Sequence, residues 1–194
     1  LMRVGADGHD VPWLAESWTL ETHDDNAAIP EGHARITFDL IQNATWTDGT
    51  PLTGEDVAFT LNYYNDGAGN PYGPDLTEMV AAYSPTTYQV VVEFASESYW
   101  NLHRIGYKPI IPKHVFESTE ADDWNEWNPT PPEQMMVTSG PFNVTEHIDG
   151  EFTELSYNPN YFFGLDRDAP ITPPNGGSFK IGRASCRERV CVGV

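Results

Sequence analysis

Hydrophobic and polar residues alternate in two runs of the sequence, residues 13–22 and 33–42. In the second run, Ile36, Phe38 and Leu40 fall on one side of an extended chain, with polar residues between them. A period of two predicts a strand with one buried face. The segment between the runs, HDDNAAIPEG, is rich in turn formers, so the pattern predicts a hairpin with a long loop.

Two more alternating regions predict further strands. Val90, Val92 and Phe94 share one face of the run TYQVVVEFA. The segment GPFNVTEHIDGEFTELSYN contains two alternating runs around Asp149 and Gly150, and an Asp-Gly pair is typical of a type I′ turn. The sequence therefore predicts a second hairpin with a two-residue turn.

The stretch NATWTDGTPLTGEDVAFTLNYYND predicts a turn that leads into a helix. Its Asp-Gly-Thr-Pro run has turn chemistry, because Gly accepts a positive φ and Pro fixes the next φ. Thr53 stands three residues before Asp56, which is the spacing of a capping box with Asp in place of Glu. Val57 and Leu61 then begin an apolar stripe at helical spacing, and we expect the helix to end near Asp66.

Three carboxylates in this stretch, Asp48, Glu55 and Asp56, suggest two other kinds of site, and the spacing excludes both. A calcium loop needs carboxylate or amide ligands at alternating positions before its glycine, and the residues that precede Gly49 do not supply this series. A catalytic pair must face across a cleft, whereas neighbours on a helix surface diverge. We therefore expect these acids to serve the turn and the helix start, where the helix dipole favours negative charge.

Charge is distributed unevenly along the chain. Residues 1–177 contain 28 acidic and six basic residues and no cysteine, and Lys108 and Lys113 are their only lysines. So acidic a segment repels nucleic acid, because a protein needs a basic face to bind phosphates. The same composition suits an exported protein. The chain opens on Leu1 in mid-pattern, with no signal peptide and no apolar run long enough to span a membrane, so we expect a fragment.

The last residues, 178–194, do not match the rest of the chain. They reverse the local charge and contain both cysteines, Cys186 and Cys191, without the flanking ligands of a zinc site. The string IGRASCRERV resembles a translated sequencing-adapter read-through. We therefore treat this segment as a non-native tail and exclude it from fold reasoning.

Motifs for catalysis, metals and cofactors are missing from the sequence. It contains no HExxH, GxSxG, P-loop or GxGxxG pattern, so we expect no enzyme, no metal site and no cofactor. The acidic run EADDWNEWNP could grip a cation, but a solvated loop anchored by its tryptophans is the simpler interpretation.

Five segments resemble a known family, and they occur in the family's order. They are VPWLAESWTL, ITFDLIQNATWTDGTPLTGEDVAFTLNYY, YQVVVEFASESYWNL, PIIPKHVFE and TSGPFNVTEHIDGEFTELSYNPNYFFG. Over about residues 4–164, the chain resembles family 5 extracellular solute-binding proteins, the oligopeptide-, dipeptide- and nickel-binding receptors of ABC importers. Two departures are Gly54 where the family usually has Ala and Phe142 where Tyr is common.

The resemblance implies an α+β fold, a fragment of a two-lobed periplasmic-binding-protein-like (type II) structure that closes on its ligand. Residues 1–136 resemble the small subdomain of lobe I. Residues 137–177 resemble the return segment into the core sheet of that lobe. The second lobe is expected to be absent from this chain.

The resemblance also implies a function, the capture of a small ligand for the permease subunits of an ABC importer. A short peptide is the first expectation, with a nickel complex or a sugar as other options. The location implied is periplasmic or extracellular, with a lipid anchor to the cell membrane as one option. No nucleic acid partner is expected.

Five residues are candidates for ligand contacts by the same resemblance: Tyr72, Tyr99, Trp100, Ser139 and Gly140. Tyr72, in GNPYGPDL, is equally well explained as a packing aromatic, and Tyr99 and Trp100 face either the core or the cleft. Two rival classes remain. A secreted carbohydrate-binding module would need an exposed coplanar aromatic platform, and a hydrolase would need a paired acid and base.

Overall fold

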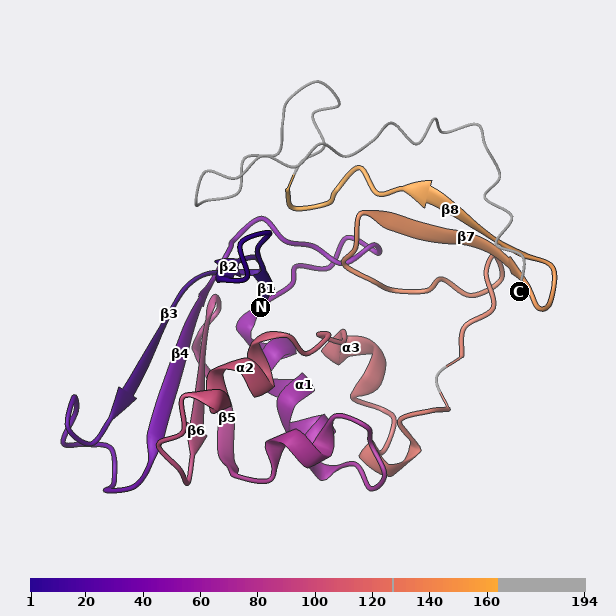
Figure 1. Cartoon of the computed structure of the whole chain (residues 1–194). Coiled ribbons are helices and arrows are strands. Elements are labelled where there is room, and N and C mark those ends of the chain that lie inside the picture. Colours follow the sequence, from indigo (N-terminus) through magenta and orange to yellow (C-terminus); the bar gives the residue numbers. More distant parts are fainter. Residues whose placement is uncertain (127, 164–194) are drawn as a thin grey trace. The chain divides into compact units, whose positions relative to one another are not determined.

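The computed structural model describes residues 1–126 and 128–163 (Figure 1). The chain divides into two compact units. Unit 1 consists of Leu1–Gln42 and Thr53–Trp124, and unit 2 consists of Asn43–Leu52 and the chain from Asn125 onward. The tail segment that the sequence sets apart, residues 178–194, lies outside the described residues.

Unit 1 is built around an antiparallel sheet of four strands in the order β3-β4-β6-β5. Its elements are β1 (Met2–Val4), β2 (Asp10–Pro12), β3 (Ala15–Thr22), β4 (Ala34–Leu40), α1 (Gly54–Asp66), the 3₁₀ helix η1 (Gly73–Leu76), β5 (Met79–Thr86), β6 (Gln89–Phe94), α2 (Trp100–Gly106), α3 (Lys113–Phe116) and the 3₁₀ helix η2 (Ala121–Asp123). The predicted hairpin of the first two alternating runs is confirmed as β3 and β4.

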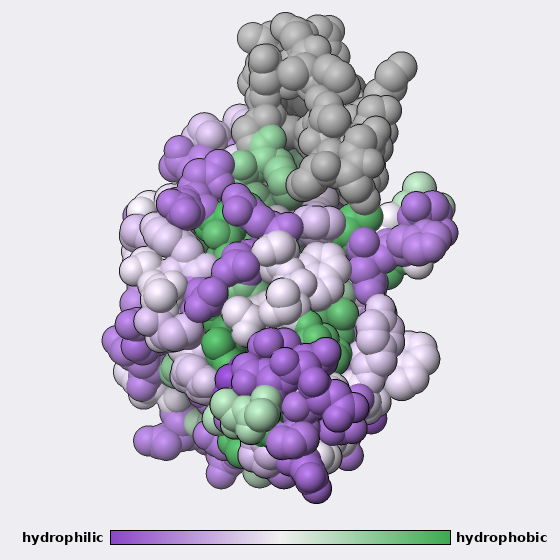
Figure 2. All heavy atoms as spheres, turned by 90° about the vertical axis from the view of Figure 1, so that its left-hand side faces the viewer, coloured by the Kyte–Doolittle hydropathy of each residue, from purple (hydrophilic) through white to green (hydrophobic). Residues whose placement is uncertain are grey.

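The core of unit 1 lies between the sheet and α1, which packs against β5 and β6 (Figure 1). Ile36 pairs with Val92 and Phe38 with Val90 across β4 and β6, and all four side chains are fully buried, as is Phe94. The period-two prediction for these strands is therefore confirmed. On the side shown in Figure 2, apolar residues form small areas among hydrophilic ones, which suits an antiparallel sheet with one solvated face.

Helix α1 begins as predicted, with a capping box between Thr53 and Asp56, and ends at the cap residue Gly67. The prediction that Asp56 lies on the helix surface is wrong. Its side chain is buried, and its two carboxylate oxygens accept hydrogen bonds from the backbone nitrogens of Thr53 and Lys113, each at 2.9 Å. Asp56 therefore joins the start of α1 to the start of α3.

Unit 2 contains one hairpin among its described residues, formed by β7 (Phe142–Ile148) and β8 (Phe152–Tyr157). The hairpin is confirmed, but its predicted type I′ turn is wrong. That turn needs positive φ at both central residues. Ile148 pairs with Phe152, so the turn has three residues, and only Gly150 among them has a positive φ, of 73°. A longer turn with glycine in the left-handed region removes the need for strain at Asp149.

Candidate ligand-binding site

The loop between α1 and η1 fixes the backbone around Tyr72. Asn70 is buried, and its side-chain oxygen accepts the backbone N–H of Tyr72 at 3.0 Å. The carbonyl of Asn70 also accepts the backbone N–H of Gly73 at 3.1 Å. A Cβ at Gly73 would lie 2.9 Å from the carbonyl oxygen of Tyr64, closer than real Cβ contacts, so the loop requires glycine there.

The ring of Tyr72 is half-buried against Tyr64, with ring centroids 4.8 Å apart. Tyr64 donates its hydroxyl to the carbonyl of Pro109 at 2.9 Å, and burial raises the pKa of that phenol. The hydroxyl of Tyr72, by contrast, makes no hydrogen bond to any described residue. Tyr72 thus combines a fixed ring with a free polar group, which is what a ligand contact requires.

A buried lysine completes this group of side chains. The Nζ atom of Lys108 lies 5.0 Å from the ring centroid of Tyr72, within the range of a cation–π interaction, and forms an ion pair with Asp75. The side chain of Lys108 is only 8% exposed, whereas that of Asp75 is 57% exposed. We call Tyr64, Tyr72, Asp75 and Lys108 the Tyr72 cluster.

Tyr99 and Trp100 lie at the start of α2 and are 60% and 66% exposed. The sequence left open whether these side chains face the core or the cleft, and their exposure excludes the core. Both rings contact His103, at centroid distances of 5.1 and 5.3 Å, and are inclined to it by 61° and 51°. His103 Nε2 lies 2.9 Å from an Asp10 carboxylate oxygen. The hydroxyl of Tyr107 donates to the same carboxylate, and burial together with this bond raises the pKa of Tyr107 to about 12.

Ser139 and Gly140 belong to unit 2, where hydrogen bonds hold the chain on both sides of them. Two hydrogen bonds join Thr47 and Thr138. The backbone N–H of Thr47 donates to the carbonyl of Thr138 at 2.8 Å, and the backbone N–H of Thr138 donates to Oγ1 of Thr47 at 3.0 Å. The buried amide of Asn158 donates to the carbonyl of Gly140 at 2.8 Å. A Cβ at Gly140 would meet no atom within 4 Å, so the space beside this backbone is open.

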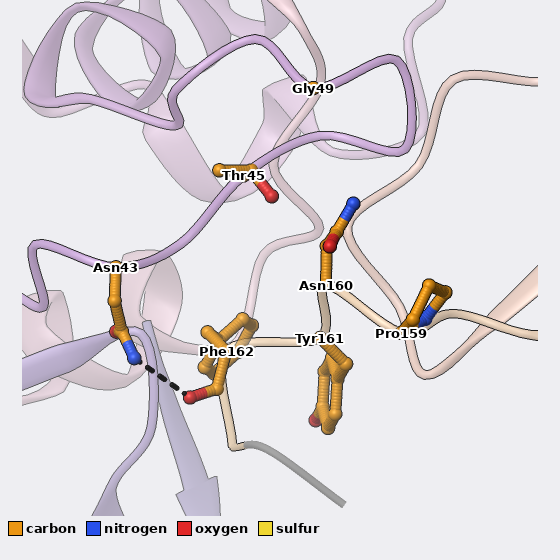
Figure 3. A pocket seen from close by; sticks show the side chains of 7 residues that line it. All are labelled: Asn43, Thr45, Gly49, Pro159, Asn160, Tyr161 and Phe162. Carbon is orange, nitrogen blue, oxygen red and sulfur yellow. Dashed lines mark hydrogen bonds between the residues drawn. The ribbon is translucent and has the colours of Figure 1, made fainter.

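A hollow of about 450 Å³ lies elsewhere in unit 2 (Figure 3). Its lining carries no charged side chain and consists of Asn43, Thr45, Gly49, Pro159, Asn160, Tyr161 and Phe162. Asn43 closes one side by donating to the carbonyl of Phe162 at 3.1 Å, while the buried Thr45 hydroxyl has no hydrogen-bond partner among the described residues. Sequence reasoning missed this hollow, because its residues come from segments more than a hundred positions apart.

The five predicted residues form separate groups. Tyr99 and Trp100 are neighbours that share His103, and Ser139 adjoins Gly140 in the other unit. Tyr72 stands in its own cluster. Lys108, a member of that cluster, directly follows Tyr107, the cap residue at the end of α2.

Asp75 and Lys108 were missed as partners of Tyr72. The available signal was the scarcity of lysine, because only two occur in residues 1–177. A lysine kept in so acidic a chain is a candidate for a specific ion pair.

The acidic run before Trp127 is used for structure. The Asp122 carboxylate accepts the backbone N–H of Ala68 at 2.6 Å, and the carbonyl of Glu120 accepts the Tyr63 hydroxyl at 3.1 Å. No group of three or more metal-ligating side chains occurs within residues 1–126 and 128–163. Over the same ranges, no helix has the length and apolar character needed to cross a membrane.

Known proteins resemble this chain in sequence and in structure. The family model for bacterial extracellular solute-binding proteins, family 5 (middle), matches residues 11–182. A Brucella ovis protein, provisionally named as a peptide-binding protein of an ABC transporter, is 26% identical over 129 residues. That alignment covers 64% of this chain and 23% of the relative.

Two solved structures share the fold. NikZ from Campylobacter jejuni, in complex with Ni(L-His), has a TM-score of 0.68 and 18% identity over 84% of this chain. The oligopeptide-binding protein AppA from Bacillus subtilis, in complex with a nonapeptide, has a TM-score of 0.66 and 22% identity over 88% of this chain.

This chain spans 30% of NikZ, 31% of AppA and 23% of the Brucella relative. The expected α+β architecture, part of a periplasmic-binding-protein-like structure, is confirmed by these likenesses. Because the family model covers most of the chain, the protein belongs to family 5 of the bacterial extracellular solute-binding proteins.

Proposed function

We propose that this chain belongs to a receptor that captures a short peptide and delivers it to an ABC importer. The observation that carries the proposal is the family match over residues 11–182, which indicates a binding protein rather than an enzyme. The name of the Brucella relative and the nonapeptide bound by AppA both support a peptide as the ligand.

The partners in this proposal are the permease subunits of the importer. The extracellular family and the strongly acidic composition support a periplasmic or extracellular location, and a lipid anchor would keep such a receptor near its permease. A sugar-binding module is not favoured, because the family model for solute-binding proteins matches residues 11–182.

The ligand contacts we propose are Tyr72, Tyr99, Trp100, Ser139 and Gly140. Tyr72 has the best support among them, because Asn70, Tyr64 and Lys108 fix it while no described residue occupies its hydroxyl. A phenol hydroxyl can donate to a peptide carbonyl or accept from a peptide N–H. Contacts that are already in place reduce the entropy lost on binding.

A metal chelate is the second candidate ligand, because NikZ shares the fold and holds Ni(L-His). The two candidates can be separated by NMR titration of the isotope-labelled 194-residue chain with a mixed-sequence nonapeptide and, separately, with Ni(L-His). We expect the nonapeptide at millimolar concentration to shift the amide signals of residues 70–76 until they saturate, and Tyr72→Ala to abolish the effect. Saturable shifts with Ni(L-His) alone would overturn the peptide assignment.

The isolated chain is expected to bind weakly. Ligand pockets bury most of the ligand surface, and this chain spans less than a third of the two solved relatives. Titration calorimetry with the nonapeptide should therefore show no binding near micromolar concentration. Micromolar affinity would contradict the proposal that the second lobe completes the site.

A further inference from the structure

The Tyr72 cluster buries its cation and exposes its carboxylate. Lys108 is 8% exposed and Asp75 is 57% exposed, so an approaching ligand meets the carboxylate before the ammonium group. The ion pair uses Oδ2 of Asp75, and no described residue donates to Oδ1. One carboxylate oxygen of Asp75 is thus available, within the same cluster as the Tyr72 hydroxyl, which likewise makes no hydrogen bond to a described residue.

The turn geometry places these two groups together. Tyr72 is the residue that precedes η1, with helical φ and ψ of −94° and −17°, and Asp75 follows three positions later. Side chains three residues apart lie on the same side of a 3₁₀ helix. Lys108 contacts both of them, so the ring and the carboxylate are oriented by one buried side chain.

Charge decides which ligand group suits this arrangement. A ligand anion would meet the exposed Asp75 on a chain with a net charge of −19. A ligand cation would find a carboxylate oxygen and a phenol oxygen, both of which accept hydrogen bonds from ammonium and guanidinium groups. Lys108 neutralises part of the Asp75 charge, so the preference is expected to come from a directed hydrogen bond rather than from long-range attraction.

We propose that Asp75 is a ligand contact that selects an ammonium or guanidinium group, such as the side chain of a basic residue in a peptide. Lys108 is the positioning residue that holds Asp75 and Tyr72 in place. This inference rests on the proposed capture of peptides, and it adds the chemical class of side chain that the site accepts.

The test is an NMR titration of the 194-residue chain with the tripeptides Ala-Arg-Ala and Ala-Ala-Ala. We expect Ala-Arg-Ala to bind about tenfold more tightly at the signals of residues 70–76, the effect of one charge-assisted hydrogen bond. Asp75→Asn should abolish this preference. The matched control is Asp66→Asn, which removes an exposed carboxylate at the end of α1 and should leave the preference intact.

Each outcome decides between the two proposals. Equal binding of both tripeptides, or a preference that survives Asp75→Asn, overturns the role of Asp75 and leaves peptide capture standing. No response to either tripeptide at millimolar concentration overturns this inference, and peptide capture falls with it if the nonapeptide also gives no response. If Asp75→Asn fails to fold because Lys108 loses its partner, the double variant Asp75→Asn with Lys108→Met removes both charges. That variant should bind the two tripeptides equally, and a retained preference for arginine would again overturn the proposal.

Discussion

The two units differ in how many of their buried polar side-chain atoms form hydrogen bonds with described residues. In unit 1, the only buried side-chain polar atom without a partner among them is His103 Nδ1. In unit 2 there are four such atoms: Thr45 Oγ1, Trp46 Nε1, Thr138 Oγ1 and Asn143 Oδ1. Buried polar atoms are nearly always hydrogen-bonded in native proteins. Among the described residues, unit 1 therefore satisfies nearly all of its buried polar side-chain atoms, whereas unit 2 leaves four such atoms without a partner.

Strand pairing shows the same contrast. The four-stranded sheet of unit 1 buries a continuous apolar face under α1. Unit 2 has a two-stranded hairpin in which Phe142 and Leu155 are 41% and 53% exposed. An isolated hairpin is marginally stable in water. Tyr72, the proposed ligand contact with the best support, therefore stands on the unit whose described part is more complete.

The largest expected effect comes from the core of unit 1. Phe38→Ala should lower the free energy of unfolding by about 3–5 kcal/mol, because it removes a fully buried ring and leaves a cavity. The matched change in unit 2, Phe142→Ala, should cost less than about 1 kcal/mol, since that ring is partly exposed. Chemical denaturation of both variants measures the difference. Equal losses would contradict the comparison of the units.

The next effect concerns the buried carboxylate of α1. Asp56→Asn should cost about 1.5–3 kcal/mol, because a charged acceptor of two backbone N–H groups is lost. Thr53→Ala should cost about 1 kcal/mol through the weakened cap. Glu55→Gln is the control, and it should change stability by less than about 0.5 kcal/mol, since the Glu55–Lys113 pair is exposed. Thermal unfolding measures these losses. A larger loss of stability for Thr53→Ala than for Asp56→Asn would contradict the burial of Asp56 and support its predicted place on the helix surface.

A pair of matched hydroxyl deletions sharpens the contrast between satisfied and unsatisfied groups. Thr60 is fully buried in unit 1, donates to the carbonyl of Asp56 at 2.6 Å and accepts the N–H of Ile111 at 3.1 Å. Thr60→Val should cost about 1–3 kcal/mol, because the Ile111 N–H loses its acceptor. Thr138→Val removes a hydroxyl that has no partner within the described part of the chain, so we expect a change within about 0.5 kcal/mol. Equal costs in urea unfolding would show that the Thr138 hydroxyl is satisfied.

The smallest effect is a dependence on alkaline pH. The pKa of Tyr107 is raised from 10.0 to about 12, so between these values the unfolded chain loses this proton while the folded chain keeps it. The stabilising contribution is complete below pH 10 and is lost as pH rises through 12. Tyr107→Phe should make unfolding stability fall less steeply across this range. An unchanged slope would contradict the bond between Tyr107 and Asp10.

Local patterns in the sequence predicted much of unit 1. Alternation located β4 and β6, and the spacing of Thr53 and Asp56 located the start of α1, because these signals lie within a few residues. The burial of Asp56 could not be predicted in this way, because the backbone group that covers it belongs to Lys113, 57 residues later.

The candidate site was less predictable for the same reason. The resemblance singled out Tyr72, but its partner Lys108 lies 33 residues from Asp75, and neither side chain belongs to a periodic pattern. The turn at Gly150 shows another limit. An Asp-Gly pair fits several turns, and the register of β7 with β8 selects the three-residue form.

The claim that Tyr72 stands on the more complete unit is tested most directly by amide hydrogen exchange of the unliganded chain. The account predicts slow exchange for β4, β6 and the backbone N–H groups of Tyr72 and Gly73, which Asn70 holds, and much faster exchange for β7 and β8. Equal protection of both units, or rapid exchange at Tyr72 and Gly73 with protection of β7 and β8, would contradict it.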